Sequence, residues 1–438
     1  MHRLLLQTQK LQQQQQRRCL FTANTLNTTT KTTSNNNNGP KPGDRVMVAM
    51  SGGVDSSVTA ALLKDQGFQV QGIYMRNWDT SDERGECTSV QDWQDVQRVC
   101  EKLNIQDCRH VNFVKEYWTD VFQQTLDDYA HGLTPNPDIA CNRHIKFGAL
   151  LAHVPDDTWL ATGHYCRSLF QQQDHHRHQL WRGRDRKKDQ SYFLASVDAR
   201  AIQRTLFPLG EFESKAKVKA IAHQLDLHVA KKRESMGICF VGQRRRFADF
   251  LKEYIDQPPG PAVDVCTGKR IGDHRGLFAY TVGQASKICY GSDKWFVAQK
   301  RMSDNTLLCV PGSDHPALFH SACTARDWVW IEGRPPPHFL FSSGNNNNND
   351  NNNNNTDHHQ HQDGQGSVLV DAQVRYRMAA QKARLSRLQD GRYHLEFLEP
   401  IRAMAPGQQV VIYLGDWCLG GGTIQDIYNN THSPVSIV

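Results

Sequence analysis

Two features of this chain could do chemistry: a segment suited to holding phosphate and a pair of candidate cysteine nucleophiles. The first is Ser51-Gly52-Gly53-Val54-Asp55-Ser56-Ser57. It follows an apolar run at 46–50 that predicts a buried strand, and it precedes a helical pattern at 58–64. A strand, turn and helix in this order direct backbone N–H groups and a helix N-terminus at an anion. The chain has no G-x-x-x-x-G-K-[ST] motif, so this is not a Walker loop.

The first candidate nucleophile, Cys141, lies in Thr134-Pro135-Asn136-Pro137-Asp138-Ile139-Ala140-Cys141-Asn142. The two prolines predict a rigid loop that fixes Asn136, Asp138 and Cys141 relative to one another. A helix is predicted over 144–151, and its N-terminus, with basic neighbours, would lower the pKa of the thiol. The alternative is a proline-rich connector with a buried structural cysteine.

The second candidate, Cys239, lies in Ser235-Met236-Gly237-Ile238-Cys239-Phe240. Basic residues at 231–233 and 244–246 flank it, and such a setting favours a thiolate. The alternative is a small buried residue in an apolar strand. Neither cysteine belongs to a C-x-x-C pair or a zinc-type spacing, and the twelve cysteines of the chain are scattered.

The elements that must position these residues alternate between strand and helix from residue 44 to about 208. Strands are predicted at 70–75, 109–113 and 159–164, and helices at 90–103 and 116–130. This alternation predicts an α/β fold with a parallel sheet and helices on both faces. Ligands of such sheets bind at the carboxyl ends of the strands, where the serine-glycine segment, Met75 and Gly163 all fall.

The later part of the chain has a different pattern. Hairpins are predicted at 294–310, 384–398 and 408–423, which favours a small antiparallel barrel. We therefore expect a leader at 1–43, a catalytic domain at 44–240, a small central domain at 241–285 and a barrel at 286–438. Polar inserts at 171–178 and 344–366, the second one Asn- and His-rich, are interpreted as surface loops without chemistry.

Charge separates the leader from the rest of the 438 residues. The net charge of +6 arises in residues 1–43, which hold six basic residues and no acidic one. The remaining 45 basic residues balance 45 acidic ones, so nucleic-acid binding would depend on local patches. The basic, acid-free leader is typical of a mitochondrial presequence, and a low-complexity tail is the alternative. No apolar run reaches the ~18 residues of a membrane span.

Taken together, the segments resemble a known family. The sequence SGGVDSS resembles the PP-loop motif of ATP pyrophosphatases. With both cysteine segments in this order, the chain from about Arg45 onward resembles the tRNA-specific 2-thiouridylases. The leader makes it most similar to their mitochondrial members. Further segments carry the resemblance: 73–78, 161–165, 188–194, 208–211, 281–284, 374–377 and 419–422.

The resemblance implies roles for particular residues. The ATP site would comprise Ala49, Met50, Ser51, Gly52, Gly53, Val54, Asp55 and Ser56, with Met75 and Gly163 beside the adenine. The target base would contact Asn136, Pro137 and Asp138, and other parts of the tRNA would contact Lys188, Asp189, Gln190, Arg375 and Tyr376. Cys141 would be the nucleophile, Cys239 would carry a persulfide, and Asp138 would act as a general acid or base.

The resemblance also implies a reaction, its cofactors and its partners. The enzyme would adenylate the C2 oxygen of the wobble uridine (position 34) with ATP, helped by Mg²⁺, and replace it with sulfur from a cysteine persulfide. The sulfur would attack C2 directly, with a disulfide between Cys141 and Cys239 as by-product, or Cys141 would first release hydrosulfide. The implied partners are tRNA and an upstream persulfide-relay protein, with no membrane, and the implied location is the mitochondrial matrix.

Two other functions remain open at this point. A PP-loop amidating ligase would use the same loop but neither cysteine segment, and a non-catalytic RNA-binding derivative would use neither. The basic stretch 182–188 is a candidate phosphate-tracking patch, with a solvated surface turn as the alternative. The segment after Gln284 lacks the long basic, glycine-rich loop of relatives, which leaves its tRNA contacts open.

Overall fold

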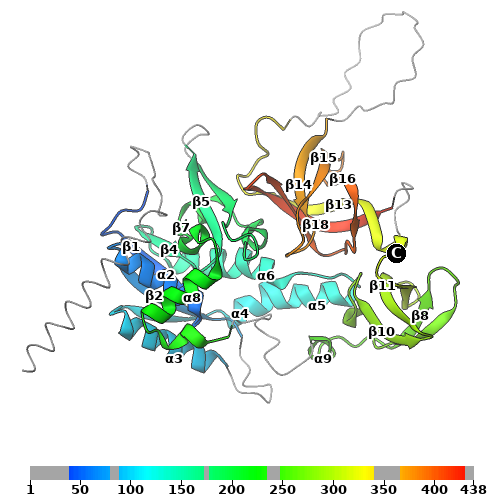
Figure 1. Ribbon diagram of the computed structural model, residues 1–438, viewed down its shortest axis with the longest axis horizontal. Coiled ribbons are helices and arrows are strands. Elements are labelled where there is room, and N and C mark those ends of the chain that lie inside the picture. The colour runs from blue at the N-terminus through cyan, green and yellow to red at the C-terminus, as the bar shows by residue number, and fades with distance from the viewer. Residues whose placement is uncertain (1–38, 79–87, 172–176, 234–246, 340–365, 430–438) are drawn as a thin grey trace, which may run out of the picture.

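The computed structural model of the protein describes residues 39–78, 88–171, 177–233, 247–339 and 366–429. Most of the leader, Cys239 and nearly all of the Asn-rich insert lie outside these ranges. Three sheets organise the described residues, and Figure 1 shows them as three bodies. The parallel sheet lies on the left, a small sheet at the lower right and a barrel at the upper right.

The first sheet is parallel and has the order β3-β2-β1-β4-β7. Its strands are β1 (Arg45–Met50), β2 (Gln69–Arg76), β3 (Cys108–Asn112), β4 (Thr158–Ala161) and β7 (Thr205–Leu206). The strand order reverses between β1 and β4, because the chain moves outward from β1 to β3 and then returns to the other side of β1. A reversal of this kind is the place where open α/β sheets bind ligands.

Helices cover both faces of this sheet, as the sequence predicts. Val46 and Val48 face one apolar core with α2 (Val54–Asp65), α3 (Thr88–Lys102) and α8 (Lys215–Gln224). Met47, between them on β1, faces the other core. The helices there are α4 (Val114–Tyr117), η1 (Trp118–Phe122), α5 (Gln123–Ala130), α6 (Pro137–Ala140) and η2 (Cys141–Ala149). Shorter helical turns are η3 (Leu151–His153), η4 (Ser191–Leu194), α7 (Ala199–Gln203), η5 (Pro208–Glu211), η6 (His228–Lys231), α9 (Phe247–Leu251), η7 (Leu277–Ala279) and η8 (Pro316–Leu318).

The second sheet has the order β10-β11-β12-β8-β9. Its strands are β8 (Gly260–Asp264), β9 (Arg270–His274), β10 (Ala285–Tyr290), β11 (Asp293–Arg301) and β12 (Thr306–Pro311). The domain boundary expected at 285/286 falls inside this sheet, because β12 pairs with β8 and so joins the predicted hairpin at 294–310 to the central domain. A hairpin pattern does not reveal which sheet the hairpin enters.

The third sheet closes into an antiparallel barrel. It comprises β13 (Phe319–Trp330), β14 (Val368–Gln373), β15 (Gln381–Arg387), β16 (Tyr393–Arg402), β17 (Gln409–Leu414) and β18 (Trp417–Tyr428). Pairing of β13 with β18 completes the closure. A hairpin from the first domain, β5 (Cys166–Gln171) and β6 (Arg177–Arg182), joins the barrel where Trp181 pairs with Trp417. Of the insert predicted at 171–178, residue 171 ends β5, residues 177 and 178 begin β6, and residues 172–176 lie outside the described ranges.

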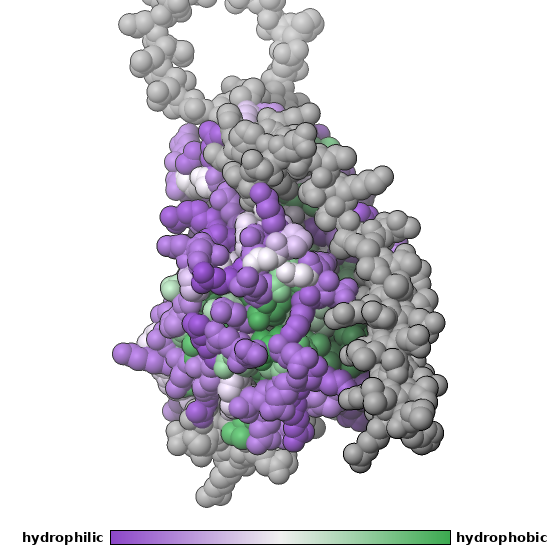
Figure 2. Space-filling view, turned by 90° about the vertical axis from the view of Figure 1, so that its left-hand side faces the viewer, coloured by the Kyte–Doolittle hydropathy of each residue, from purple (hydrophilic) through white to green (hydrophobic). Residues whose placement is uncertain are grey.

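The face of the molecule that Figure 2 shows is mainly hydrophilic, with apolar side chains gathered near its middle. In the described parts of the chain, no helix combines the length and the apolar character needed to cross a membrane.

Candidate active site

The serine-glycine loop connects β1 to α2 at the carboxyl edge of the parallel sheet. Ser56 Oγ accepts a hydrogen bond from the Ser51 amide at 3.1 Å and lies 3.2 Å from Ser51 Oγ. Gly52 has a φ of +69°, and a side-chain carbon there would lie 2.6 Å from the carbonyl oxygen of Asp92. Only glycine fits this turn without strain. No side chain caps α2 at Gly53, so the first N–H groups of the helix are available to an anion.

Asp55 lies in the first turn of α2 and is held from two sides. Tyr165 donates its hydroxyl to Asp55 Oδ1 at 2.8 Å, and Lys215 donates to Asp55 Oδ2 at 2.8 Å. Lys215 begins α8 and Tyr165 precedes β5, so elements more than 100 residues away fix this carboxylate. Sequence reasoning identified Asp55 but not its two partners.

Lys232 is a second cation at the loop. Its Nζ lies 3.0 Å from the carbonyl oxygen of Gly52, 2.7 Å from Asp92 Oδ1 and 2.6 Å from Asp95 Oδ2. Burial alone would lower the pKa of Lys232, but the two carboxylates outweigh it and raise the pKa. The sequence reading assigned Lys232 to the surroundings of Cys239, whereas its ammonium lies against the loop. Its position directly after the short helix η6 gave no signal for this contact.

The other predicted nucleotide residues lie on the same edge. In the register of β1 with β2, Met50 pairs with Tyr74, so Met75 lies one residue beyond the end of β1. Gly163 follows β4, the neighbour of β1 on its other side. A side-chain carbon at Gly163 would lie 3.0 Å from Ser56 N and from the Asp55 carbonyl carbon. Met75, the loop and Gly163 therefore surround the switch point of the sheet.

The segment with Asn136 and Cys141 forms one continuous helix from Pro137 to Ala149, with a π-helical second part. The helix begins seven residues earlier than the predicted 144, because Asn136 caps it and Pro137 occupies its first turn. Asn136 Oδ1 accepts the Asp138 amide at 3.2 Å. The sequence contained this signal, since Asn before Pro is a common helix start.

The side chain of Asp138 is exposed at the surface, although many protein atoms lie around it. Desolvation raises the pKa of Asp138, and the charge of Lys146 opposes this rise. Desolvation also lowers the pKa of the buried His164 well below its usual value, and Lys146 adds to that effect. The charge of Lys146 thus shifts the pKa of Asp138, on its own helix, and the pKa of His164, just after β4. The Phe147 ring, 5.9 Å from the His164 ring, joins the same two elements.

Cys141 is 4% exposed and lies in the fifth position of this helix. Cys239 lies outside the described residues, so the predicted approach of the two sulfur atoms stays a prediction. No disulfide joins two of the described cysteines. Asn142, next to Cys141, donates from Nδ2 to the Phe193 carbonyl at 3.3 Å, which ties the helix to η4.

The predicted tRNA residues 188–190 differ in how they are placed. Asp189 is only 6% exposed, and its carboxylate accepts hydrogen bonds from the Gly183 amide and from the amide and hydroxyl of Ser191. The Asp189 carboxylate therefore stabilises the conformation of this loop, because its oxygens are already engaged by loop residues. Gln190 Oε1 accepts the Tyr165 amide at 2.9 Å.

Arg375 and Tyr376 come from the barrel and lie close to the same loop. The Tyr376 ring is 4.3 Å from the Phe193 ring, and Arg375 donates to the Val282 carbonyl at 2.7 Å. A cavity of about 700 Å³ lies between the two domains here, with residues of both in its wall. It is lined by Arg182, Arg186, Lys187, Asp189, Asp371, Gln373, Tyr376, Arg377, Met378, Ala379, Ala380, Gly415 and Asp416. The fold thus brings together two sets of predicted tRNA residues that are almost 190 positions apart.

Comparison with known proteins identifies the family. The tRNA methyl transferase HUP domain family matches residues 44–243, and the tRNA methyl transferase PRC-barrel domain family matches 248–311. The aminomethyltransferase beta-barrel domain family matches 351–424. The tRNA-specific 2-thiouridylase MnmA of Staphylococcus aureus strain JH9 is 42% identical over 390 residues, which is 88% of this chain and 96% of that protein. The strain Newman protein matches equally well.

The chain belongs to the tRNA-specific 2-thiouridylase family. Membership implies ATP use and a tRNA substrate. Both of these relatives are bacterial, so they do not test the prediction of a mitochondrial location. Among solved structures, the U34-tRNA thiolase NcsA from Methanococcus maripaludis with its [4Fe-4S] cluster matches at 17% identity and a TM-score of 0.29. That match covers 45% of this chain and 62% of that one, and we draw nothing from it.

The basic stretch 182–188 of this thiouridylase is only partly available as a phosphate patch. Arg182 faces Asp189 at 3.5 Å and lies 3.5 Å above the Tyr413 ring, Arg184 pairs with Glu211 at 2.6 Å, and Arg186 pairs with Asp416. The three ion pairs neutralise three of its five positive charges, and the contacts of Arg186 with Asp416 and of Arg182 with Tyr413 join the loop to the barrel.

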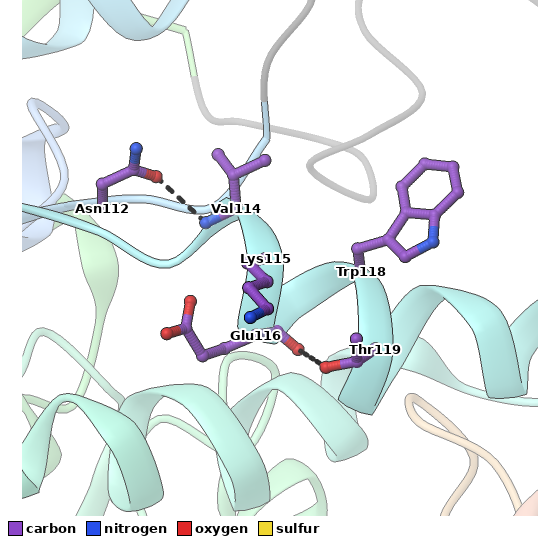
Figure 3. Close-up of a pocket in the computed structure, with 6 residues that line it drawn as sticks. All are labelled: Asn112, Val114, Lys115, Glu116, Trp118 and Thr119. Carbon is purple, nitrogen blue, oxygen red and sulfur yellow. Dashed lines mark hydrogen bonds between the residues drawn. The ribbon is translucent and has the colours of Figure 1, made fainter.

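A second cavity, of about 480 Å³, lies beside the first turn of α4 and is lined by Asn112, Val114, Lys115, Glu116, Trp118 and Thr119. In Figure 3 the Trp118 indole points away from Asn112 and Glu116. None of the residues predicted from the thiouridylase motifs lines this cavity, so we assign it no role in the reaction.

Proposed function

We propose that the protein is an ATP-dependent tRNA sulfurtransferase that converts the C2 carbonyl of the wobble uridine to a thiocarbonyl. One observation carries the proposal within the thiouridylase family. Gly163 contacts the first turn of α2, and its neighbour His164 lies 5.9 Å from the Phe147 ring of the helix that holds Asp138 and Cys141. The charge of Lys146 shifts the pKa of both Asp138 and His164. A phosphate site and a candidate base site are thus neighbours, as transfer between nucleotide and base requires.

ATP is the first substrate in this proposal. Its phosphates would lie on the loop from Ser51 to Ser56, where free N–H groups and the helix dipole favour negative charge. Met75 and Gly163 flank the loop and would border the adenine. Gly53 belongs to the turn, which lies between the end of β1 at Ala49 and Met50 and the start of α2 at Val54.

Among the described residues no group of three or more potential metal ligands occurs. Mg²⁺ would therefore be held mainly by phosphate oxygens and water. Asp55 would become a ligand only by giving up its bond to Tyr165 or Lys215, which now occupy both of its oxygens. Mg²⁺ would neutralise charge on the transferring phosphate.

The uridine would leave the anticodon stack to reach the site. Its C2 oxygen would attack the α-phosphate of ATP, the α–β phosphoanhydride would break, and pyrophosphate would leave. This step turns a poor leaving group into AMP. Asn136 and Pro137 would border the base, and Asp138, whose pKa is raised by desolvation, would exchange a proton with it.

Sulfur transfer requires two cysteines. The terminal sulfur of a Cys239 persulfide would attack C2 and expel AMP, and the Cys141 thiolate would then break the S–S bond and release the thiouridine. Alternatively, Cys141 would attack the persulfide first and release hydrosulfide. Either way the sulfane sulfur is reduced by two electrons and the two thiols are oxidised to a disulfide, so a thiol reductant must reset the enzyme.

The experiment is thiolation of unmodified tRNA with ATP and a persulfide donor, followed by nucleoside mass spectrometry. Cys141→Ser and Cys239→Ser should each abolish 2-thiouridine, while Cys289→Ser, an exposed cysteine of the central sheet, should not. Normal thiolation by either of the first two variants would exclude the two-thiol route. Transfer of nitrogen instead of sulfur would indicate an amidating ligase, and absence of tRNA-dependent AMP would indicate a non-catalytic protein.

A further inference from the structure

We infer that Lys300 of the central domain is a positioning residue for the segment that carries Asn136 and Asp138. The inference rests on the proposed function, because it assigns a role in base activation to a lysine outside the motifs. Lys300 lies on β11, and its Nζ is 3.5 Å from the carbonyl oxygen of Leu133. Leu133 comes three residues before Asn136.

Two domains hold the segment 132–134 from opposite sides. From the central domain, Met302 packs so closely that a side-chain carbon at Gly132 would lie 2.6 Å from its sulfur. From the barrel, the carbonyl of Pro406 accepts the Thr134 amide at 2.9 Å, and Gln408 Nε2 donates to the Thr134 carbonyl at 2.8 Å. In Figure 1 the long helix ending in α5 runs from the first domain to the edge of the small sheet, below the barrel.

Five of the six backbone polar groups of this short segment have a hydrogen-bond partner. The Gly132 and Leu133 amides donate back into α5, to the carbonyls of Tyr129 and Asp128. The Thr134 groups bond to the barrel, and the Leu133 carbonyl has the Lys300 ammonium. Because Pro135 and Pro137 stiffen the chain that follows, a displacement of this segment would be passed on to Asn136 and Asp138.

Burying the ammonium of Lys300 for this one contact destabilises the folded protein. Lys300 is 3% exposed, and no carboxylate among the described residues forms an ion pair with it. Desolvation lowers the pKa of Lys300 to about 7. A methionine would fill the same volume without burying a charge. A group that costs stability at a site next to reacting residues is the expected signature of a functional constraint.

The test compares Lys300→Met with Lys294→Met, an exposed lysine on the same strand. Lys300→Met should raise the unfolding midpoint yet lower the kcat of tRNA-dependent AMP formation at least about 10-fold, since small misplacements of reacting groups are costly. The KM for ATP should change less than about 2-fold, because the ATP loop is on another element. Lys300→Gln, which retains a donor, should recover part of the lost rate, whereas Lys294→Met should match the wild type.

Hydrogen exchange separates this inference from the proposed function. The amides of Thr134, Asn136, Asp138 and Ile139 should exchange faster in Lys300→Met than in the wild type or in Lys294→Met, whatever reaction the enzyme catalyses. Unchanged exchange, or a Lys300→Met enzyme with normal kcat, overturns the positioning role. If the wild type makes no thiouridine, the proposed function fails, and the exchange data alone decide on Lys300.

Discussion

The ammonium of Lys232 lies 3.0 Å from the carbonyl oxygen of Gly52, across 180 residues of sequence. Asp92 and Asp95 hold the same ammonium, so the loop that we assign to ATP phosphates is tied to α3 and to the end of η6. This contact fixes the turn before any nucleotide arrives.

Lys232→Met should both destabilise the protein and weaken ATP binding. Asp95 is buried and would lose its main cation, which we expect to cost about 2 kcal/mol of unfolding free energy. Burial by itself raises the pKa of Asp95, but the bonds from Lys232 and Gln91 outweigh it and keep the pKa low. The stability from this pair is thus present above the ordinary carboxyl pKa and is lost as the pH falls through the lowered value.

Denaturant unfolding and calorimetric ATP titration measure both effects. Lys231→Met is the matched control, because Lys231 is the exposed neighbour of Lys232. Equal stability and equal ATP affinity of the two variants would show that the contact with Gly52 has no energetic role.

Gly163→Ala should weaken ATP binding with little loss of tRNA binding. The added carbon would lie 3.0 Å from the Ser56 amide nitrogen, which is tighter than ordinary contacts, so the first turn of α2 must shift. We expect a rise of about 10-fold in the Kd for ATP, since about 1.4 kcal/mol of lost contacts suffices for that. A Gly39→Ala control changes a glycine that has open space around it and no left-handed backbone angle. An unchanged Kd for ATP in Gly163→Ala would place the nucleotide elsewhere.

Asp138→Asn should remove a titration from the pH profile of adenylation. Desolvation raises the pKa of Asp138 above its ordinary value of 3.8. As the pH is lowered, the wild-type kcat should therefore begin to fall at a higher pH than an aspartate of ordinary pKa would cause. The amide keeps the shape but carries no titrating proton, and kcat should drop about 10²-fold or more. Stopped assays of tRNA-dependent pyrophosphate release between pH 5 and 8 measure this, and an acidic limb that persists in the variant would assign it to another group.

Lys300 should make the unfolding free energy depend on pH in a defined direction. Its folded-state pKa of about 7 lies below the unfolded value of 10.5, so the unfolded chain binds more protons between these values. The wild type should therefore gain stability, relative to Lys300→Met, as the pH rises from 7 towards 10.5. Near pH 7 the methionine variant should be more stable by up to about 4 kcal/mol. Urea unfolding at a series of pH values checks this, and parallel curves for the two proteins would contradict it.

Residues 1–43 should direct an attached fluorescent protein to mitochondria. The expectation rests on their basic, acid-free composition, because most of these residues lie outside the described structure. Replacing Arg3, Arg17 and Arg18 by Gln should abolish import if positive charge is the signal. Diffuse fluorescence of the unmodified fusion would refute the matrix assignment.

The sequence by itself determined the local chemistry of this protein. The strand before Ser51, the helix after it and the alternation up to β4 follow from short-range hydrophobic patterns, which act over a few residues. The helix start at Asn136 was also written locally, although the predicted start came seven residues late. Hairpins were recognisable for the same reason.

Tertiary structure decided which distant groups meet. The cation of Lys232 at Gly52, the two partners of Asp55 and the burial of Asp189 depend on packing between elements. Packing between elements also decides which sheet the hairpin of β11 and β12 joins, and it brings Lys300 to Leu133. A lysine looks the same in the sequence whether it is solvated or buried, since only the folded chain sets the solvent around it and the charges it faces.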